Sequence, residues 1–114
     1  MNTLEQADQL INKVCEIYGF DRALLSRRNS FKPVRVIGKG KSKIDVASIR
    51  MALGLFLSTY SDINHDVIGP MCGYTDHTTL VYIRKKATYY IEFDDVKFVP
   101  HWEKVCSIAQ NMGM

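Results

Sequence analysis

One segment, residues 44–60, constrains the fold more than any other, because it is apolar around nearly the whole circumference of a helix. Its sequence, IDVASIRMALGLFLSTY, contains two charged residues, Asp45 and Arg50. A helix that is apolar on all sides has to be covered by other elements of the protein. The segment therefore predicts a central, buried helix around which the rest of the chain packs.

The remaining apolar residues also recur at helical spacing. Residues 4–18 repeat apolar positions every three or four residues, and Gly19 follows as a stop signal. We expect a short turn at 22–26 and a last helix at 99–111, with its proline in the first turn, where proline is tolerated. A chain of 114 residues has a length typical of one domain. The sequence therefore predicts a single all-α domain of five to six helices over residues 1–114.

Residues 64–91 have the outline of a helix-turn-helix. A short helix is expected at about 64–72, and Pro70 should bend or shorten it. After a glycine turn, Thr75 or Asp76 can cap a longer helix that runs to the end of the segment. Many helical hairpins share this outline, so the side chains of the second helix decide what it favours.

The second helix of this hairpin has one apolar side and one polar side. Acidic residues are absent from the polar, outward side. Small hydroxyl side chains let a helix lie deep in a DNA groove, and lysines further along contact the backbone. At 100° per residue, the predicted core face is Leu80, Ile83, Ala87, Tyr90 and Ile91, and the predicted outward face is Thr75, Thr78, Thr79, Tyr82, Lys85, Lys86 and Tyr89.

Positive charge is concentrated in one short segment of the chain. Residues 22–43 contain eight basic residues and no acidic residue, although the net charge of the whole chain is only +3. Within this segment, residues 27–43 include a proline and two glycines, so we expect a basic loop there that can hold a small ribbon at 34–37. Such a block favours a polyanion, either nucleic acid or an anionic surface, and it is equally typical of a solvated loop.

Membrane insertion and export are disfavoured. No apolar run approaches 18 residues, and the N-terminus lacks a basic segment followed by an apolar one. Three cysteines cannot all pair with one another, which fits a reduced compartment. We therefore expect a cytoplasmic protein without a membrane partner.

Two weak signals for chemistry do not lead to an enzyme. The Gly-Lys-Ser at 40–42 lacks the earlier glycine of a nucleotide-binding phosphate loop, because Arg35 stands at that position. The two Cys/His pairs of the sequence are each five residues apart, a spacing that does not suit a zinc site on a helix. We therefore expect no catalytic activity, no bound nucleotide, no metal and no other cofactor.

Several segments resemble, in order, the C-terminal DNA-binding domain of the replication initiator DnaA. The signature of that family is an Ile-Gly, then a Gly, then Arg-Asp-His-Thr-Thr-Val. This chain has Ile-Gly at 68–69 and CGYTDHTTL at 72–80. Residues 11–18 resemble the first helix of the family, 24–28 (LLSRR) its basic loop, and 46–52 its long helix with an arginine on the DNA side.

The resemblance covers about residues 10–91 and implies a Trp-repressor-like helix-turn-helix that binds double-stranded DNA. It implies base contacts in the major groove, phosphate contacts from two surface cations, and a minor-groove contact from the basic loop. The residues that it implies are Asp76, His77 and Thr78, with Thr79 nearby, for the bases, Arg50 and Lys86 for phosphates, and Arg27 and Arg28 for the minor groove.

The chain departs from the family pattern in several places. Thr75 stands where the family has an arginine, Asn29 stands where the loop has its third basic residue, and Pro70 replaces an ordinary helical residue. Extra residues within 31–43 lengthen the basic loop. These differences affect the prediction of which DNA sequence is recognised more than the prediction that DNA is bound. The ATPase domain of the family is not part of this sequence, so we do not expect a full initiator.

Each site residue also has an ordinary structural interpretation. Asp76 is as well placed to cap the helix as to contact a base. His77 can be a partly exposed histidine, Arg50 can pair with a carboxylate, and a lysine pair such as 85–86 is usually solvated. The leading hypothesis is sequence-specific DNA binding in replication initiation control or transcriptional regulation. The alternative is a protein-interaction adaptor that keeps the fold without reading DNA, and the oligomeric state is left open, a monomer included.

Overall fold

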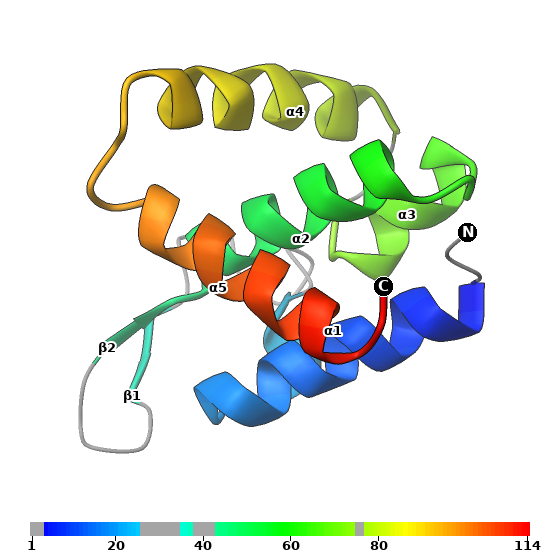
Figure 1. Cartoon of the computed structure of the whole chain (residues 1–114), viewed down its shortest axis with the longest axis horizontal. Helices are drawn as coiled ribbons and strands as arrows, with labels where there is room; N and C mark the ends of the chain where they lie inside the picture. Colours follow the sequence, from blue (N-terminus) through cyan, green and yellow to red (C-terminus); the bar gives the residue numbers. More distant parts are fainter. Residues whose placement is uncertain (1–3, 26–34, 38–42, 75–76) are drawn as a thin grey trace.

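A computed structural model describes residues 4–25, 35–37, 43–74 and 77–114, and this part of the chain is all-α, as predicted. One short antiparallel strand pair accompanies the helices (Figure 1). In chain order the elements are α1 (Leu4–Tyr18), the 3-10 helix η1 (Arg22–Leu25), β1 (Arg35–Ile37), β2 (Lys43–Asp45), α2 (Val46–Tyr60), α3 (His65–Met71), α4 (His77–Glu92) and α5 (Val99–Asn111).

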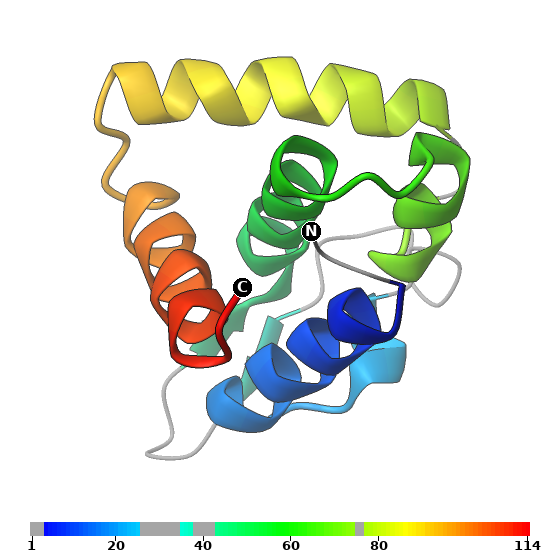
Figure 2. The same cartoon turned by 45° about the vertical axis from the view of Figure 1, so that its right-hand side comes forward.

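The central helix is α2, as its sequence predicts. Figures 1 and 2 show α4 running along the top of the molecule, α1 at the bottom and α2 between them. α2 packs against α3, α4, α5 and η1. The side chains of Ile49, Leu53 and Leu57 have no exposed surface, and the buried apolar side chains of the described residues form one cluster around this helix.

The start of α2 differs from the prediction by two residues. Ile44 and Asp45 belong to β2, where Asp45 lies opposite Arg35 in the antiparallel register. The Asp45 carboxylate accepts hydrogen bonds from the amide and hydroxyl of Ser48, at 3.1 and 2.7 Å, and so caps the helix. Ile44 and Asp45 therefore lie in a strand, because they pair with β1, although periodicity alone assigns them to the helix.

The other bounds follow the prediction closely. Gly19 ends α1 with a φ of 84°, which favours glycine, and its amide donates to the carbonyl of Cys15 at 2.8 Å. Pro100 lies in the first turn of α5. The predicted ribbon is present as β1, although the sequence did not identify its partner β2. The rest of the basic loop, residues 27–34 and 38–42, lies outside the described residues.

A hydrogen-bonded corner joins α4 to α5. Asp94 adopts a left-handed φ of 51°, and the amide of Asp95 donates to the carbonyl of Tyr90 at 2.9 Å. The Asp95 carboxylate then accepts from the amides of Lys97 and Phe98, at 2.9 and 3.0 Å. These bonds fix the direction in which α5 leaves the end of α4.

Candidate nucleic-acid interface

The helix-turn-helix is formed by α3, by α4 and by a connection whose described residues are 72–74. The side chain of Asn64 caps α3 by accepting from the amide of Asp66 at 2.8 Å. Gly73 ends α3 with a φ of 96°, and the amide of Tyr74 donates to the carbonyl of Gly69 at 2.8 Å. Pro70 lies within the last turn, so α3 accommodates the proline at its end and remains short, as predicted.

The hairpin lies close against the central helix. A β-carbon at Gly54 of α2 would lie 3.1 Å from Cδ1 of Leu80 and 3.3 Å from Cε2 of Tyr74. Both distances are shorter than ordinary van der Waals contact, so glycine allows the turn and the start of α4 to approach α2 this closely. Leu80 has no exposed surface and Tyr74 has 4%. The position of α4 is therefore set by packing against α2 and α3.

The two sides of α4 are arranged as predicted over the described side chains from Thr79 onward; Thr75 and the side chain of Thr78 lie outside the described part of the protein. On the inner side Leu80, Ile83 and Ala87 are buried, and Tyr90 and Ile91 are partly buried against the core. On the outer side Tyr82 and Tyr89 are 64% and 57% exposed. No described helix lies above α4 in either view (Figures 1 and 2). Its outer side is therefore available to a partner along the described length of the helix.

The structure brings only part of the predicted set of site residues into view. Arg27, Arg28 and Asp76 lie outside the described residues. His77 and Thr78 are the first two residues of α4, and their side chains also lie outside the described part of the protein. Thr79, Arg50 and Lys86 are described, with Thr79 partly buried at the edge of the outer side.

Arg50 does not lie on the surface, contrary to the sequence-based expectation. Its residue is 6% exposed, its Nε donates to the carbonyl of Leu25 at 2.5 Å, and its guanidinium carbon lies 6.0 Å from the centre of the Tyr74 ring. One partner of its side chain is therefore a main-chain carbonyl oxygen. Arg50 joins α2 to the end of η1 and to the turn before α4, and its phosphate contact stays a prediction.

Two further cations are partly engaged within the protein. Nη1 of Arg22, the first cation of the basic segment, lies 2.6 Å from Oδ1 of Asp8 and 2.9 Å from Oδ1 of Asn12. Nζ of Lys86 lies 5.8 Å from the centre of the Tyr90 ring, within the range of a cation–π contact. Lys86 is nevertheless exposed, so it remains accessible to a phosphate at the flank of α4.

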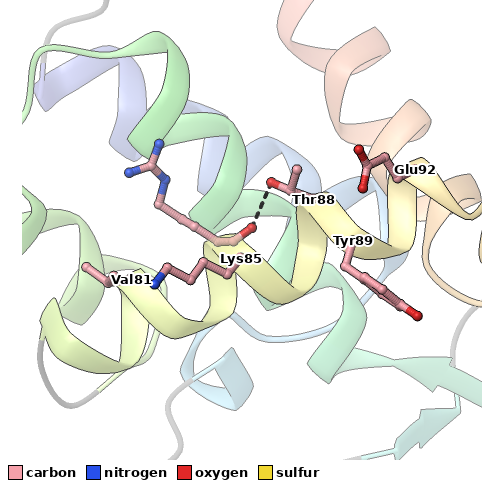
Figure 3. Close-up of a pocket in the computed structure, with 6 residues that line it drawn as sticks. Val81, Lys85, Thr88, Tyr89 and Glu92 are labelled. Atoms are coloured by element: carbon pink, nitrogen blue, oxygen red, sulfur yellow. Dashed lines mark hydrogen bonds between the residues drawn. The ribbon is translucent and has the colours of Figure 1, made fainter.

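One flank of α4 carries an open hollow of about 490 Å³ (Figure 3). Lys85 extends back along the helix toward Val81, whereas Tyr89 and Glu92 project from the other end of the hollow. The hydroxyl of Thr88 donates to the carbonyl of Arg84 at 2.8 Å. The described residues that line the hollow are Val81, Arg84, Lys85, Thr88, Tyr89 and Glu92.

Arg84 is the residue of this flank that sequence reasoning missed. It is spaced four residues after Leu80 and three before Ala87, both fully buried, so helical periodicity directs it toward the core. Its Nε is buried and has no hydrogen-bond partner among the described residues. The signal available in the sequence was a third consecutive cation, directly before Lys85 and Lys86.

Charge changes sign along α4. The described part from Thr79 to Ile91 contains three cations and no acid. Acids follow at the last residue of the helix, Glu92, and in the corner at Asp94 and Asp95. The part of α4 before Glu92 is therefore suited to a polyanion, and its end is not.

The described residues offer little for metal or thiol chemistry. No group of three metal-ligating side chains occurs among them. Burial raises the pKa of the Cys72 thiol to about 12 and that of Cys15 to about 11, so both are protonated at neutral pH. Within the same part of the chain, no helix combines the length and the apolar character needed to cross a membrane.

Comparisons with protein-family models, with curated proteins and with solved structures found no match to this chain. A function is therefore inferred from the geometry and chemistry of α3, α4 and the residues around them.

Proposed function

We propose that this protein binds double-stranded DNA sequence-specifically through α3 and α4, with α4 as the recognition helix in the major groove. The observation that carries the proposal is the outer side of α4, which no described element covers and which has hydroxyls, Lys85 and Lys86 without an acid before Glu92. An α-helix with its side chains is about 10–12 Å wide, and the major groove is about 12 Å wide. α4 therefore has both the shape and the charge for this groove.

The resemblance to the DnaA-type domain supplies the roles of individual residues in this proposal. Asp76, His77 and Thr78 contact base edges, with Thr79 beside them, at the end of α4 that lies deepest in the groove. Arg27 and Arg28 reach the minor groove. Lys86 contacts a phosphate, whereas the buried Arg50 supports the start of the basic loop and the turn before α4. The protein acts in the cytoplasm, without catalysis, in replication initiation control or transcriptional regulation.

Selection of bound fragments from a genomic library by the purified protein, followed by binding measurements, tests the proposal. His77→Ala should weaken binding to the selected site by about 1–3 kcal/mol and leave binding to random duplex nearly unchanged, because a base contact exists only on the right sequence. Lys13→Ala is the matched control, since Lys13 is an exposed cation on α1, away from α4 (Figure 1). A His77→Ala protein that keeps its full preference would remove this residue from the reading surface.

A protein-interaction adaptor is the second candidate, and one observation favours it. Phe93 and Val96, at the corner after α4, are 67% and 84% exposed, and the Phe93 ring centre lies 4.5 Å from that of Tyr89. Exposed large apolar side chains that gather in one place are typical of contact surfaces. If the wild-type protein binds no duplex even at low salt, the adaptor replaces DNA binding as the function.

A further inference from the structure

The cations of α4 are placed on both flanks of the helix. Arg84 and Lys86 are two residues apart, and therefore about 200° apart around the helix axis. Lys85 lies between them on the outer side and is exposed. A helix in the major groove has one phosphate backbone along each flank, because the groove is only about as wide as the helix. Lys86 faces one of these backbones, and Arg84 is the cation that faces the other.

In the free protein the side chain of Arg84 lacks a hydrogen-bond acceptor that a bound ligand could supply. Its Nε is buried without an acceptor among the described residues, although buried polar groups of native proteins nearly always have one. Leaving such a donor without a partner destabilises the fold. A phosphate that draws the guanidinium outward would give its donors a charged acceptor, and the planar fork of an arginine matches a phosphate better than the single ammonium group of a lysine does.

The hollow on this flank supplies the space for such a contact. It is open to solvent, and Arg84 lines it together with Lys85 and Thr88. Figure 3 shows Lys85 and Thr88 at this hollow. Glu92 is the acidic residue among its described lining residues, and it lies eight residues after Arg84. Eight residues correspond to about 12 Å along a helix. The carboxylate therefore disfavours an anion at the far end of the hollow and leaves the end near Arg84 suitable.

We propose that Arg84 binds a DNA backbone phosphate in this hollow, on the wall of the major groove opposite the one contacted by Lys86. This inference rests on the proposed DNA-binding function and assigns a second wall of contacts to the same helix. In the free protein Arg84 is kept against the body of the molecule, and on DNA its guanidinium turns outward to the phosphate. The contact is to the backbone, so it contributes equally to every DNA sequence.

The matched substitution is Arg84→Met, which keeps an unbranched stem and a similar helix propensity while removing the charge. Affinities for the selected site and for a random duplex are measured at several salt concentrations, together with the thermal midpoint of the free protein. The affinity should fall about tenfold for both duplexes, and the slope of log affinity against log salt should fall by about 0.9. The midpoint should stay the same or rise, because the unpartnered donor is gone.

Three comparisons make the result decisive. Lys13→Met removes an equal charge on α1 and should change the affinity much less. Arg84→Lys keeps the charge and should restore most of the salt slope. Wild-type protein that binds no duplex overturns the proposed function itself. If the wild-type protein binds and the Arg84→Met protein binds equally well, this inference alone is overturned. It is also overturned if the thermal midpoint of Arg84→Met falls together with its affinity, because Arg84 would then be a structural residue.

Discussion

Replacement of Arg50 by methionine distinguishes a structural arginine from one that contacts DNA. Met removes the hydrogen bond from Nε to the Leu25 carbonyl and the contact with the Tyr74 ring, while the aliphatic stem is largely kept. A hydrogen bond that involves a charged group contributes about 1.5–3 kcal/mol, and a cation–π contact about 0.5–1 kcal/mol. We therefore expect Arg50→Met to lower the free energy of unfolding by about 2–4 kcal/mol.

This loss is large for a small domain. Native domains are stable by only about 5–15 kcal/mol, and 1 kcal/mol shifts the midpoint of a domain of this size by several degrees. The thermal midpoint should therefore fall by roughly 10 °C or more. Circular dichroism during heating measures the midpoint, and urea titration measures the free energy. Lys86→Met is the control on the exposed flank and should change the free energy by less than about 1 kcal/mol.

The effect of Arg50→Met on DNA binding should depend on temperature. The carbonyl that Arg50 holds belongs to Leu25, which directly precedes the segment with Arg27 and Arg28. Well below the midpoint, the variant should lose affinity mainly through this loop and keep the preference carried by α4. A variant with an unchanged midpoint and a reduced affinity for every duplex would refute this reasoning and place the guanidinium at a phosphate.

Two further predictions concern the pKa of His101 and the exposure of the three cysteines. Burial lowers the pKa of His101, whose Nδ1 lies 2.7 Å from the Tyr18 hydroxyl, below its ordinary value of 6.5. As the pH falls, the His101 imidazole therefore takes up a proton in the unfolded chain before it does so in the folded protein, and the stability that His101 contributes above about pH 6.5 should be lost on acidification. The free energies of unfolding from urea titrations at pH 7.5 and 5.5 should therefore differ less for His101→Phe than for the wild-type protein. Cys106 is partly exposed, whereas Cys15 and Cys72 are buried. A chromogenic thiol reagent at pH 8 should therefore label Cys106 in the folded protein and the other two cysteines only in urea. Rapid labelling of all three without urea would show that the core opens readily.

The helices of this protein could be predicted from sequence because their signals are local. Periodicity and a glycine stop define α1, and apolar character around the whole circumference identifies α2 as the central helix. Ile44 and Asp45 were assigned wrongly because their conformation depends on pairing with Val36 and Arg35 of β1, and helical periodicity does not contain that information.

Arg50 and Arg84 are the two residues of the candidate site whose positions were not predicted from the sequence. Arg50 was expected on the surface because the family resemblance implies a phosphate contact for it, but it is buried, with the carbonyl of Leu25 and the ring of Tyr74 among its contacts. Arg84 was overlooked because its spacing pointed to the core. In both cases the decisive information is which groups from other elements surround the side chain, and packing determines those groups.

The division of α4 into a cationic part and an acidic end also limits how DNA can lie on it. A duplex that followed the whole helix would bring a phosphate backbone close to Glu92 and Asp94, with a repulsion that increases at low salt. In the proposed complex we therefore expect the part of α4 before Glu92 to lie in the groove and the last turn to rise away from the DNA. On this arrangement Phe93 and Val96 stay exposed in the complex, because the corner that holds them is on the acidic side. A protein contact at the corner would thus be compatible with the proposed DNA binding on one molecule.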